Sequence, residues 1–97
     1  MTQYEVMYIL NADLEESKRQ EVIENIHGII TKGNGTIDKV DEWGLKDFAY
    51  EIEHMKKGYY VVTLFSCETD TLKEFDRLMR INANVVRFMI INQDEKK

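Results

Sequence analysis

The sequence predicts an α+β fold in which two helices cover one face of a four-stranded antiparallel sheet. Three observations lead to this prediction. Six segments follow in the order strand, helix, strand, strand, helix, strand; the strand segments are rich in β-branched and aromatic residues; and both helical segments repeat apolar residues every three or four positions. This order is the split βαβ, or ferredoxin-like (βαββαβ), arrangement. We expect the 97 residues to form one domain, 1–97, with a short polar tail from about residue 93.

The first strand is predicted at Tyr4–Leu10, which is apolar on both faces and therefore expected to be central. Asp13 and Glu16 have the spacing of a capping box at the start of the first helix, and Gly33 follows its end. Five apolar residues recur at helical spacing between them: Val22, Ile23, Ile26, Ile29 and Ile30. Gly28 costs a helix about 1 kcal/mol relative to Ala, so we expect it to mark close contact with the sheet.

The second strand is predicted over Ile37–Ile52. It is interrupted at Trp43-Gly44, where an isolated glycine favours a bulge. Glu53–Gly58 is then expected to form a hairpin loop, and Tyr59–Cys67 the returning strand. These two strands would therefore be neighbours in the sheet.

The second helix is predicted to be capped by Thr69-Asp70-Thr71, with inward residues Leu72, Phe75, Leu78 and Met79. Val85–Ile91 is the last strand. Because strand side chains alternate, Arg87 is expected to share a face with Val85, Met89 and Ile91. If Phe88 faces the helices, Arg87 must stand on the face that the helices leave bare.

The bare face of the predicted sheet is expected to be apolar. Depending on the parity of each strand, Met7 with Ile9, Tyr60 with Val62, or Met89 with Ile91 would be exposed there. An uncovered apolar patch of this kind usually marks an interaction site.

The acidic charge of the chain is concentrated in its first part. Residues 1 to 42 hold nine acids and four bases, whereas residues 43 to 92 hold seven of each, so the net charge of -5 arises before residue 43. A surface that faces RNA could lie in the neutral second part, although it would lack the long-range attraction of a basic domain.

Enzyme, metal and membrane functions find no support in the residue pattern. His27 and His54 have no Cys or His neighbours at ligand spacing, and no nucleophile with a base is apparent. Cys67 ends an apolar strand and is expected to be a buried small hydrophobe. We therefore expect a non-enzymatic protein without a metal, cofactor or small-molecule substrate. The absence of a signal peptide and of a long apolar run predicts a cytoplasmic, soluble chain.

The stretch "KGYYVVTLF" at Lys57–Phe65 is similar to the base-stacking strand of an RNA-recognition motif. The third position carries the required aromatic residue, Tyr59, but the fifth is Val61 and the small fourth position is occupied by Tyr60. An RNA-recognition-motif-like binder therefore stays an alternative. A second alternative is a stand-alone regulatory module that dimerises through its open sheet face.

A resemblance to a known family covers residues 3 to 92. "YEVMYIL", "DEWGLKDFAYEI", "GYY" and "EFDRLMRINANVVRFMI" occur in the order and at the spacing of the bacterial small-subunit ribosomal protein S6 family. The resemblance implies a structural ribosomal protein of the cytoplasmic ribosome. It also implies pairing with ribosomal protein S18 and binding to the central domain of small-subunit ribosomal RNA. Members commonly carry two or three bases after the Trp-Gly pair, whereas this chain carries one, Lys46.

Two sets of site residues follow from these considerations. We expect RNA contacts from Tyr4, Lys46, Arg80 and Arg87, and partner contacts from Trp43, Tyr50, Tyr60, Val62 and Met89. Arg80 and Arg87 are assigned to phosphate or partner contact because a guanidinium matches phosphate geometry. Arg77 is instead expected to pair with Glu74 across one helix turn.

Overall fold

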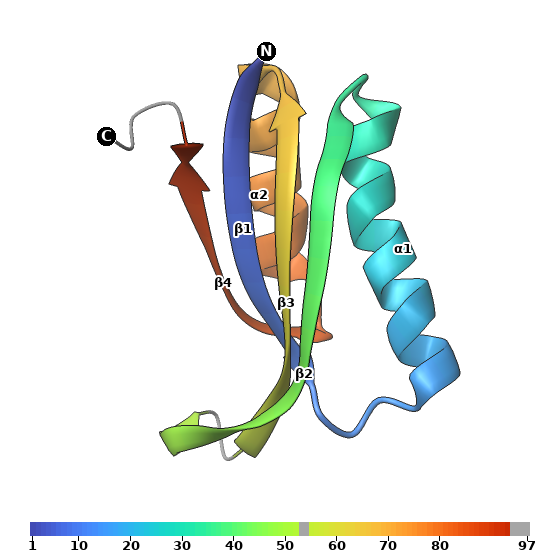
Figure 1. The fold of residues 1–97 in the computed structure, drawn as a ribbon. Coiled ribbons are helices and arrows are strands. Elements are labelled where there is room, and N and C mark those ends of the chain that lie inside the picture. The colour runs from blue at the N-terminus through green and yellow to red at the C-terminus, as the bar shows by residue number, and fades with distance from the viewer. Residues whose placement is uncertain (53–54, 94–97) are drawn as a thin grey trace.

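The structure of the chain is a computed structural model that describes residues 1–52 and 55–93. Six elements follow in the predicted order: β1 (Thr2–Asn11), α1 (Glu16–Lys32), β2 (Thr36–Ile52), β3 (Met55–Cys67), α2 (Thr69–Ile81) and β4 (Val85–Asn92). The strands form one antiparallel sheet in the order β2-β3-β1-β4, and both helices lie on the same side of it (Figure 1). The predicted split βαβ fold is confirmed.

The core lies between the two helices and the inner face of the sheet. β1 is central, as predicted, and turns Val6, Tyr8 and Leu10 inward with no exposed surface. The apolar stripes of the helices meet this face through Val22, Ile23, Ile26 and Ile30 of α1 and Phe75 and Met79 of α2. Cys67 is fully buried, as expected. Of the helices in the described part of the chain, none has the length and apolar character to cross a membrane.

The strand register fixes which side chains occupy the open face of the sheet. Phe88 and Ile90 pack against the core, so Arg87 and Met89 point the other way, which confirms their predicted parity. Val85 does not share their face. The register shifts between Ile9 and Leu10 of β1, and this irregularity turns Val85 towards the core.

The hairpin of β2 and β3 extends beyond β1 as a two-stranded ribbon, seen at the lower end of Figure 1. β1 ends opposite Gly58, whereas β2 and β3 still pair at Ile52 and Met55. The predicted loop is therefore wrong for Met55–Gly58, because this ladder continues; Glu53 and His54, and residues 94–97 of the predicted tail, lie outside the described residues. The predicted bulge is confirmed by a register shift between Glu42 and Gly44.

Both predicted helix caps are wrong. α1 begins after Glu15 and α2 after Glu68, and neither residue makes a side-chain cap hydrogen bond. The loop before α1 is organised by Asn11 instead, whose Oδ1 accepts a hydrogen bond from the Asp13 backbone N–H at 2.9 Å. Thr71 Oγ1 donates to the Gly33 carbonyl at 3.0 Å, so this hydroxyl connects the two helices rather than capping one.

Gly28 does not mark close contact with the sheet. A Cβ atom at this position would meet nothing within 4 Å, because Gly28 lies off the buried stripe formed by Ile26 and Ile30. Close packing occurs at Gly33 and Gly58 instead. At Gly33 a Cβ atom would lie 2.5 Å from Thr71 Oγ1, and at Gly58 it would collide with Ile9 and with a Phe48 ring carbon 2.8 Å away. Both positions therefore need a residue without a side chain.

Candidate nucleic-acid and protein interface

The open face of the sheet carries a continuous apolar centre. Met7 of β1 lies opposite Val62 of β3 and Met89 of β4, and Ile9 lies opposite Tyr60 and Arg87 on the same two strands. Met89 is 51% exposed. The predicted partner residues Tyr60, Val62 and Met89 are therefore brought together on one surface, next to Arg87.

An aromatic cluster occupies the part of this face near the β2–β3 ribbon. The rings of Trp43 and Tyr60 are nearly parallel, with centroids 6.4 Å apart and an interplanar angle of 7°, and the Phe48 ring lies 6.2 Å from that of Tyr60. Gly58 makes room for Phe48 and for Ile9, which is only 7% exposed although it lies on the open face. Trp43 stays 48% exposed and accessible to a partner.

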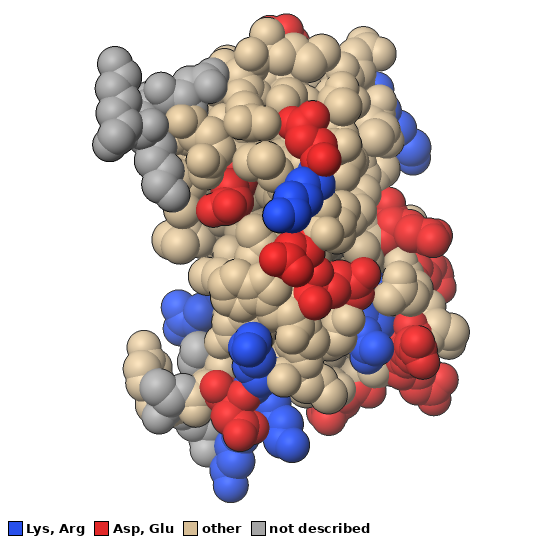
Figure 2. Space-filling view, viewed as in Figure 1, with Lys and Arg blue, Asp and Glu red and all other residues tan. Residues whose placement is uncertain are grey.

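Charges surround the aromatic cluster on both sides. Trp43 Nε1 donates a hydrogen bond to Asp41 Oδ2 at 3.2 Å, and Lys46 Nζ lies 5.9 Å from the centroid of the Trp43 ring. At the end of the sheet where β1 begins and β3 ends, Asp38 Oδ2 accepts hydrogen bonds from Ser66 Oγ at 2.7 Å and from Gln3 Nε2 at 3.3 Å. The view of Figure 2 shows acidic side chains gathered over α1 on the right and several basic ones near the lower ribbon.

A second surface, the α2–β4 groove, runs between α2 and the strand at the edge of the sheet. It consists of two hollows: one of about 570 Å³ lined by Tyr4, Leu72, Lys73, Asp76, Ile90 and Asn92, and one of about 350 Å³ lined by Met79, Arg80, Val85, Val86, Arg87 and Phe88. The structure thus brings both predicted RNA-contacting arginines to one hollow, although one comes from a helix and the other from a strand.

The two arginines of the groove differ in their partners. Arg80 Nε donates to Asp76 Oδ2 at 2.9 Å, and the Arg80 guanidinium carbon lies 5.7 Å from the centroid of the Phe88 ring. Arg87 is exposed and makes no hydrogen bond or ion pair with the described residues. Arg77, by contrast, is held by two hydrogen bonds to Glu74, at 2.8 and 3.0 Å, as expected. Arg87 therefore has all of its donors available for a ligand.

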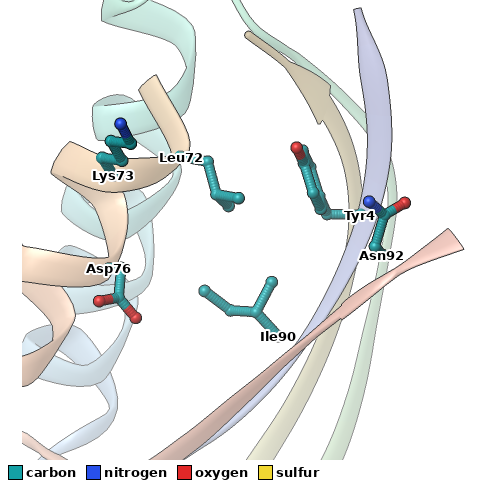
Figure 3. Close-up of a pocket in the computed structure, with 6 residues that line it drawn as sticks. All are labelled: Tyr4, Leu72, Lys73, Asp76, Ile90 and Asn92. Carbon is teal, nitrogen blue, oxygen red and sulfur yellow. The ribbon is translucent and has the colours of Figure 1, made fainter. Parts of the chain in front are cut away.

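The remaining predicted site residues are dispersed. Tyr4 is a core residue that is 6% exposed, and the centroid of its ring lies 5.7 Å from that of Phe65. Its ring faces are therefore not open to stacking. Tyr4 also lines the larger hollow of the groove (Figure 3). Lys46 lies on β2, at the opposite edge of the sheet from Arg87. Tyr50 is on the ribbon and is 76% exposed. The predicted site residues therefore lie in three places. Tyr4, Arg80 and Arg87 line the α2–β4 groove. Trp43, Tyr60, Val62 and Met89 lie on the open face, and Lys46 and Tyr50 lie towards the ribbon end of β2.

Several residues of these surfaces were not identified from the sequence. Phe48 completes the aromatic cluster, and Leu72, Lys73 and Asp76 line the groove. A signal existed for Phe48, because Gly58 stands two residues before Tyr60 and a glycine in a strand often allows close approach. The groove residues carry no such signal, since Leu72 has the spacing of any inward helix residue.

A buried polar network lies on the other side of the sheet, beneath α1. His27 Nε2 is 3.2 Å from both the Tyr8 hydroxyl and Thr63 Oγ1, and Tyr8 and Thr63 are fully buried. Burial lowers the pKa of His27 below its usual 6.5, and Glu42 opposes this in part. Burial also raises the pKa of Tyr8. The network joins helix to sheet and faces away from the open surface.

Comparison with known proteins gives consistent relationships over almost the whole chain. The family model described as Ribosomal protein S6 matches residues 3–92. The small ribosomal subunit protein bS6 of Carboxydothermus hydrogenoformans is 44% identical over 95 residues, which cover 98% of this chain and 99% of that protein. The protein of the same name from Halalkalibacterium halodurans is 41% identical over 95 residues, covering 98% of this chain and 100% of the relative.

The fold agrees with these sequence relationships. The crystal structure of 30S ribosomal protein S6 from Thermotoga maritima matches with a TM-score of 0.89 and 32% sequence identity, over 94% of this chain and 86% of that one. The resemblance inferred from the Trp-Gly and Ala-Tyr segments is therefore confirmed. Because the family model and both relatives extend over nearly all of its residues, this chain belongs to the ribosomal protein S6 family.

Proposed function

We propose that this chain is a non-enzymatic structural component of the small ribosomal subunit that binds the central domain of small-subunit ribosomal RNA together with ribosomal protein S18. Membership of the S6 family supports the assignment to the small subunit of the cytoplasmic ribosome. The observation that carries the proposal is the meeting of two surfaces at β4. Met89 faces an apolar sheet surface, and Arg87, two residues earlier, borders a hollow that also contains Arg80.

The open sheet face is the surface proposed for S18. Trp43 and Tyr60 provide the rigid aromatic surface that is common at the energetic centre of protein interfaces. Met89 and Val62 extend it with apolar area. The acidic Asp41 beside Trp43, together with the net charge of -5, favours a basic partner through electrostatic complementarity.

The α2–β4 groove is the surface proposed for RNA. Arg80 and Arg87 supply two cations there, and Lys46 supplies one at the opposite edge of the sheet. Each phosphate contact contributes about 0.9 to the slope of log affinity against log salt concentration. Three cations therefore support only weak binding by this chain alone, and the basic partner is expected to provide most of the phosphate neutralisation.

Reconstitution from purified components tests the proposal. The affinity for a central-domain RNA fragment is measured for the chain alone, for S18 alone and for both together, over a range of salt concentrations. We expect weak binding with a shallow salt slope for the chain alone and much tighter binding for the pair. A steep slope for the chain alone, or no gain on adding S18, would contradict the proposal. Co-sedimentation of the tagged chain with small subunits from lysate checks the assignment to the ribosome.

A stand-alone dimer is the second candidate, because the same bare face could cover itself. Met89, 51% exposed, is the observation that favours it. Light scattering of the purified chain distinguishes the two functions: a stable symmetric dimer supports the second, and a monomer that captures S18 supports the first. An RNA-recognition-motif-like use of the face would appear instead as quenching of Trp43 fluorescence by single-stranded RNA without any protein partner.

A further inference from the structure

Glu5 places a carboxylate within the apolar part of the open sheet face. It lies on the central strand β1, next to Val6, which is fully buried against the helices, so strand alternation turns Glu5 to the open side. Its cross-strand neighbours are apolar: Leu64 on β3 and Ile91 on β4. The residue is half-buried. An acidic group therefore stands inside this face, with a strand on either side of it, rather than at its rim.

Glu5 differs from two other acids of the open face because it has no partner. Asp38 accepts hydrogen bonds from two neutral side chains, and Asp41 accepts one from the Trp43 indole. Glu5 makes no hydrogen bond or ion pair with the residues that the structure describes. Both of its carboxylate oxygens are therefore available to a group on another molecule.

A protein that covers the open face must also supply a partner for this carboxylate. Two residues along β1, Met7 lies opposite Val62 and Met89, which belong to the surface proposed for S18. Successive residues on one face of a strand are only about 7 Å apart. A partner that covers Met7 therefore also removes water from Glu5. An ionised carboxylate that loses its water without gaining an opposite charge is strongly unfavourable.

We propose that Glu5 forms an ion pair with an arginine of S18 inside the interface. The inference rests on the proposed function, which it deepens by naming the group of S18 that this face recognises and the direction in which S18 docks. An arginine suits the site better than a lysine, because a guanidinium binds a carboxylate through two parallel hydrogen bonds and is less strongly hydrated than an ammonium group. Arginine is also enriched in protein interfaces, whereas lysine is depleted.

The charges of the open face determine the docking direction. Arg87 lies opposite Ile9, four residues along β1 from Glu5, which corresponds to about 14 Å. Lys46 lies at the same end of the face as Arg87. The end near Glu5 stays acidic, because two acids of β2 outnumber one lysine there: Asp38, Asp41 and Lys39. If S18 docked in the reverse direction, its arginine would meet cations, and such like-charge contacts exclude wrong arrangements.

Glu5 also disfavours the two other occupants of this face. The phosphates of an RNA strand laid across the sheet would be repelled by a carboxylate on its central strand. A second copy of the chain could bring its Arg87 to Glu5, but each copy carries a net charge of -5, so two copies repel one another at long range. A basic protein has neither disadvantage.

The test measures the affinity of the chain for purified S18 by titration calorimetry. Glu5→Gln keeps the shape of the side chain and removes its charge. Glu24→Gln is the matched control, because it changes the net charge equally and Glu24 is exposed on α1, on the helix side of the sheet (Figure 1). We expect Glu5→Gln to weaken S18 binding at least about thirtyfold, as is usual when one partner of a buried charge pair is removed. Glu24→Gln should change it less than about twofold, since salt screens distant surface charges.

Replacing the arginines of S18 identifies the partner group. Each arginine is changed to glutamine in turn, and its effect on binding is measured with the parent chain and with Glu5→Gln. One arginine should lose a factor similar to that of Glu5→Gln against the parent chain, and little against Glu5→Gln, as expected for two residues in contact. This scan leaves the chain itself unchanged, so it decides even if Glu5→Gln does not fold by circular dichroism.

Each alternative result has a definite meaning. Equal binding of S18 by folded Glu5→Gln and Glu24→Gln would overturn the inference and leave the proposed function intact. Tighter binding by Glu5→Gln would show a carboxylate buried without a partner, which also overturns it. The absence of any arginine coupled to Glu5 would overturn the assignment to arginine. A parent chain that does not bind S18, or that forms a dimer which Glu5→Gln dissociates, would overturn the proposed function together with this inference.

Discussion

Arg80 donates a hydrogen bond from Nε to Asp76 Oδ2 over 2.9 Å, and the resulting ion pair stands between the two hollows of the α2–β4 groove. The hydrogen bond to Asp76 raises the pKa of Arg80, so the guanidinium stays charged throughout the physiological range. Only one of its five N–H donors is used in this bond. Arg80 is thus oriented by Asp76 and still able to bind an anion.

Replacing Arg80 with Ala is expected to weaken RNA binding by the complex with S18 and to leave the fold intact. The side chain is 68% exposed, and exposed ion pairs contribute little to stability. The slope of log affinity against log salt should decrease by about 0.9 for the one lost phosphate contact. Arg77→Ala is the matched control, because Arg77 lies on the same helix but is paired with Glu74 outside the groove. An equal effect of both variants would contradict a specific role of Arg80.

Replacing Arg87 with Ala is expected to separate binding from stability. Arg87 lies on the open face opposite Ile9 and has no partner among the described residues. The free energy of unfolding should change by less than about 0.5 kcal/mol, as is usual at surface positions. The assembled complex should lose roughly 1.5 to 3 kcal/mol, the range for hydrogen bonds to a charged group. A large loss of stability in the free chain with unaltered assembly would mean that Arg87 serves the fold.

Acidification is expected to destabilise the chain through His27. Its pKa is lowered from 6.5, primarily because burial penalises the charged imidazolium, so the folded state favours the neutral ring. This contribution is fully present above pH 6.5 and is lost as the pH falls below 6.5 through the lowered pKa of the folded state. Denaturant unfolding at about pH 7 and about pH 5 should show a larger decrease for the parent than for His27→Gln. An identical decrease in both would place the effect elsewhere.

The fold could be predicted from the sequence because local and global signals agree. The strand pattern of Tyr4–Leu10 and the apolar repeat from Val22 to Ile30 lie on buried faces, and tertiary packing uses both. Both helix caps were predicted wrongly, because several polar residues near a helix start compete for the same backbone groups. Asn11 rather than Asp13 organises the loop before α1, and no sequence rule decides between them.

The surfaces were only partly predictable, for a different physical reason. Alternation within β4 places Arg87 and Met89 on the open face without any knowledge of other strands. The α2–β4 groove depends on how far the helix stands from the strand, which the periodicity of α2 does not determine. For this reason Arg80 and Arg87 could be identified separately, whereas their common hollow, and the cavity at Tyr4 and Leu72, appear only in the structure.

Introducing a charge on the open face is expected to abolish capture of S18. Met89 is 51% exposed and lies opposite Met7. In Met89→Asp, a carboxylate would have to be desolvated at the centre of an apolar interface, which is costly without a partner. The fold should remain, because the new side chain faces water in the free chain. Val40→Asp is the control. Val40 is 40% exposed and pairs with Thr63, whose side chain points to the helix side of the sheet, so Val40 lies on the face opposite to that of Met89.

Trp43 provides the measurement for this last prediction, because it is the single tryptophan of the chain and is 48% exposed beside Tyr60. When S18 covers the aromatic cluster, water leaves the indole and its emission should shift to shorter wavelengths. The shift should occur in the parent and in Val40→Asp, and should disappear in Met89→Asp at the same protein concentrations. If Met89→Asp unfolds, as judged by circular dichroism, then Met89 serves the core. A shift of normal size in folded Met89→Asp would mean that S18 docks on another surface.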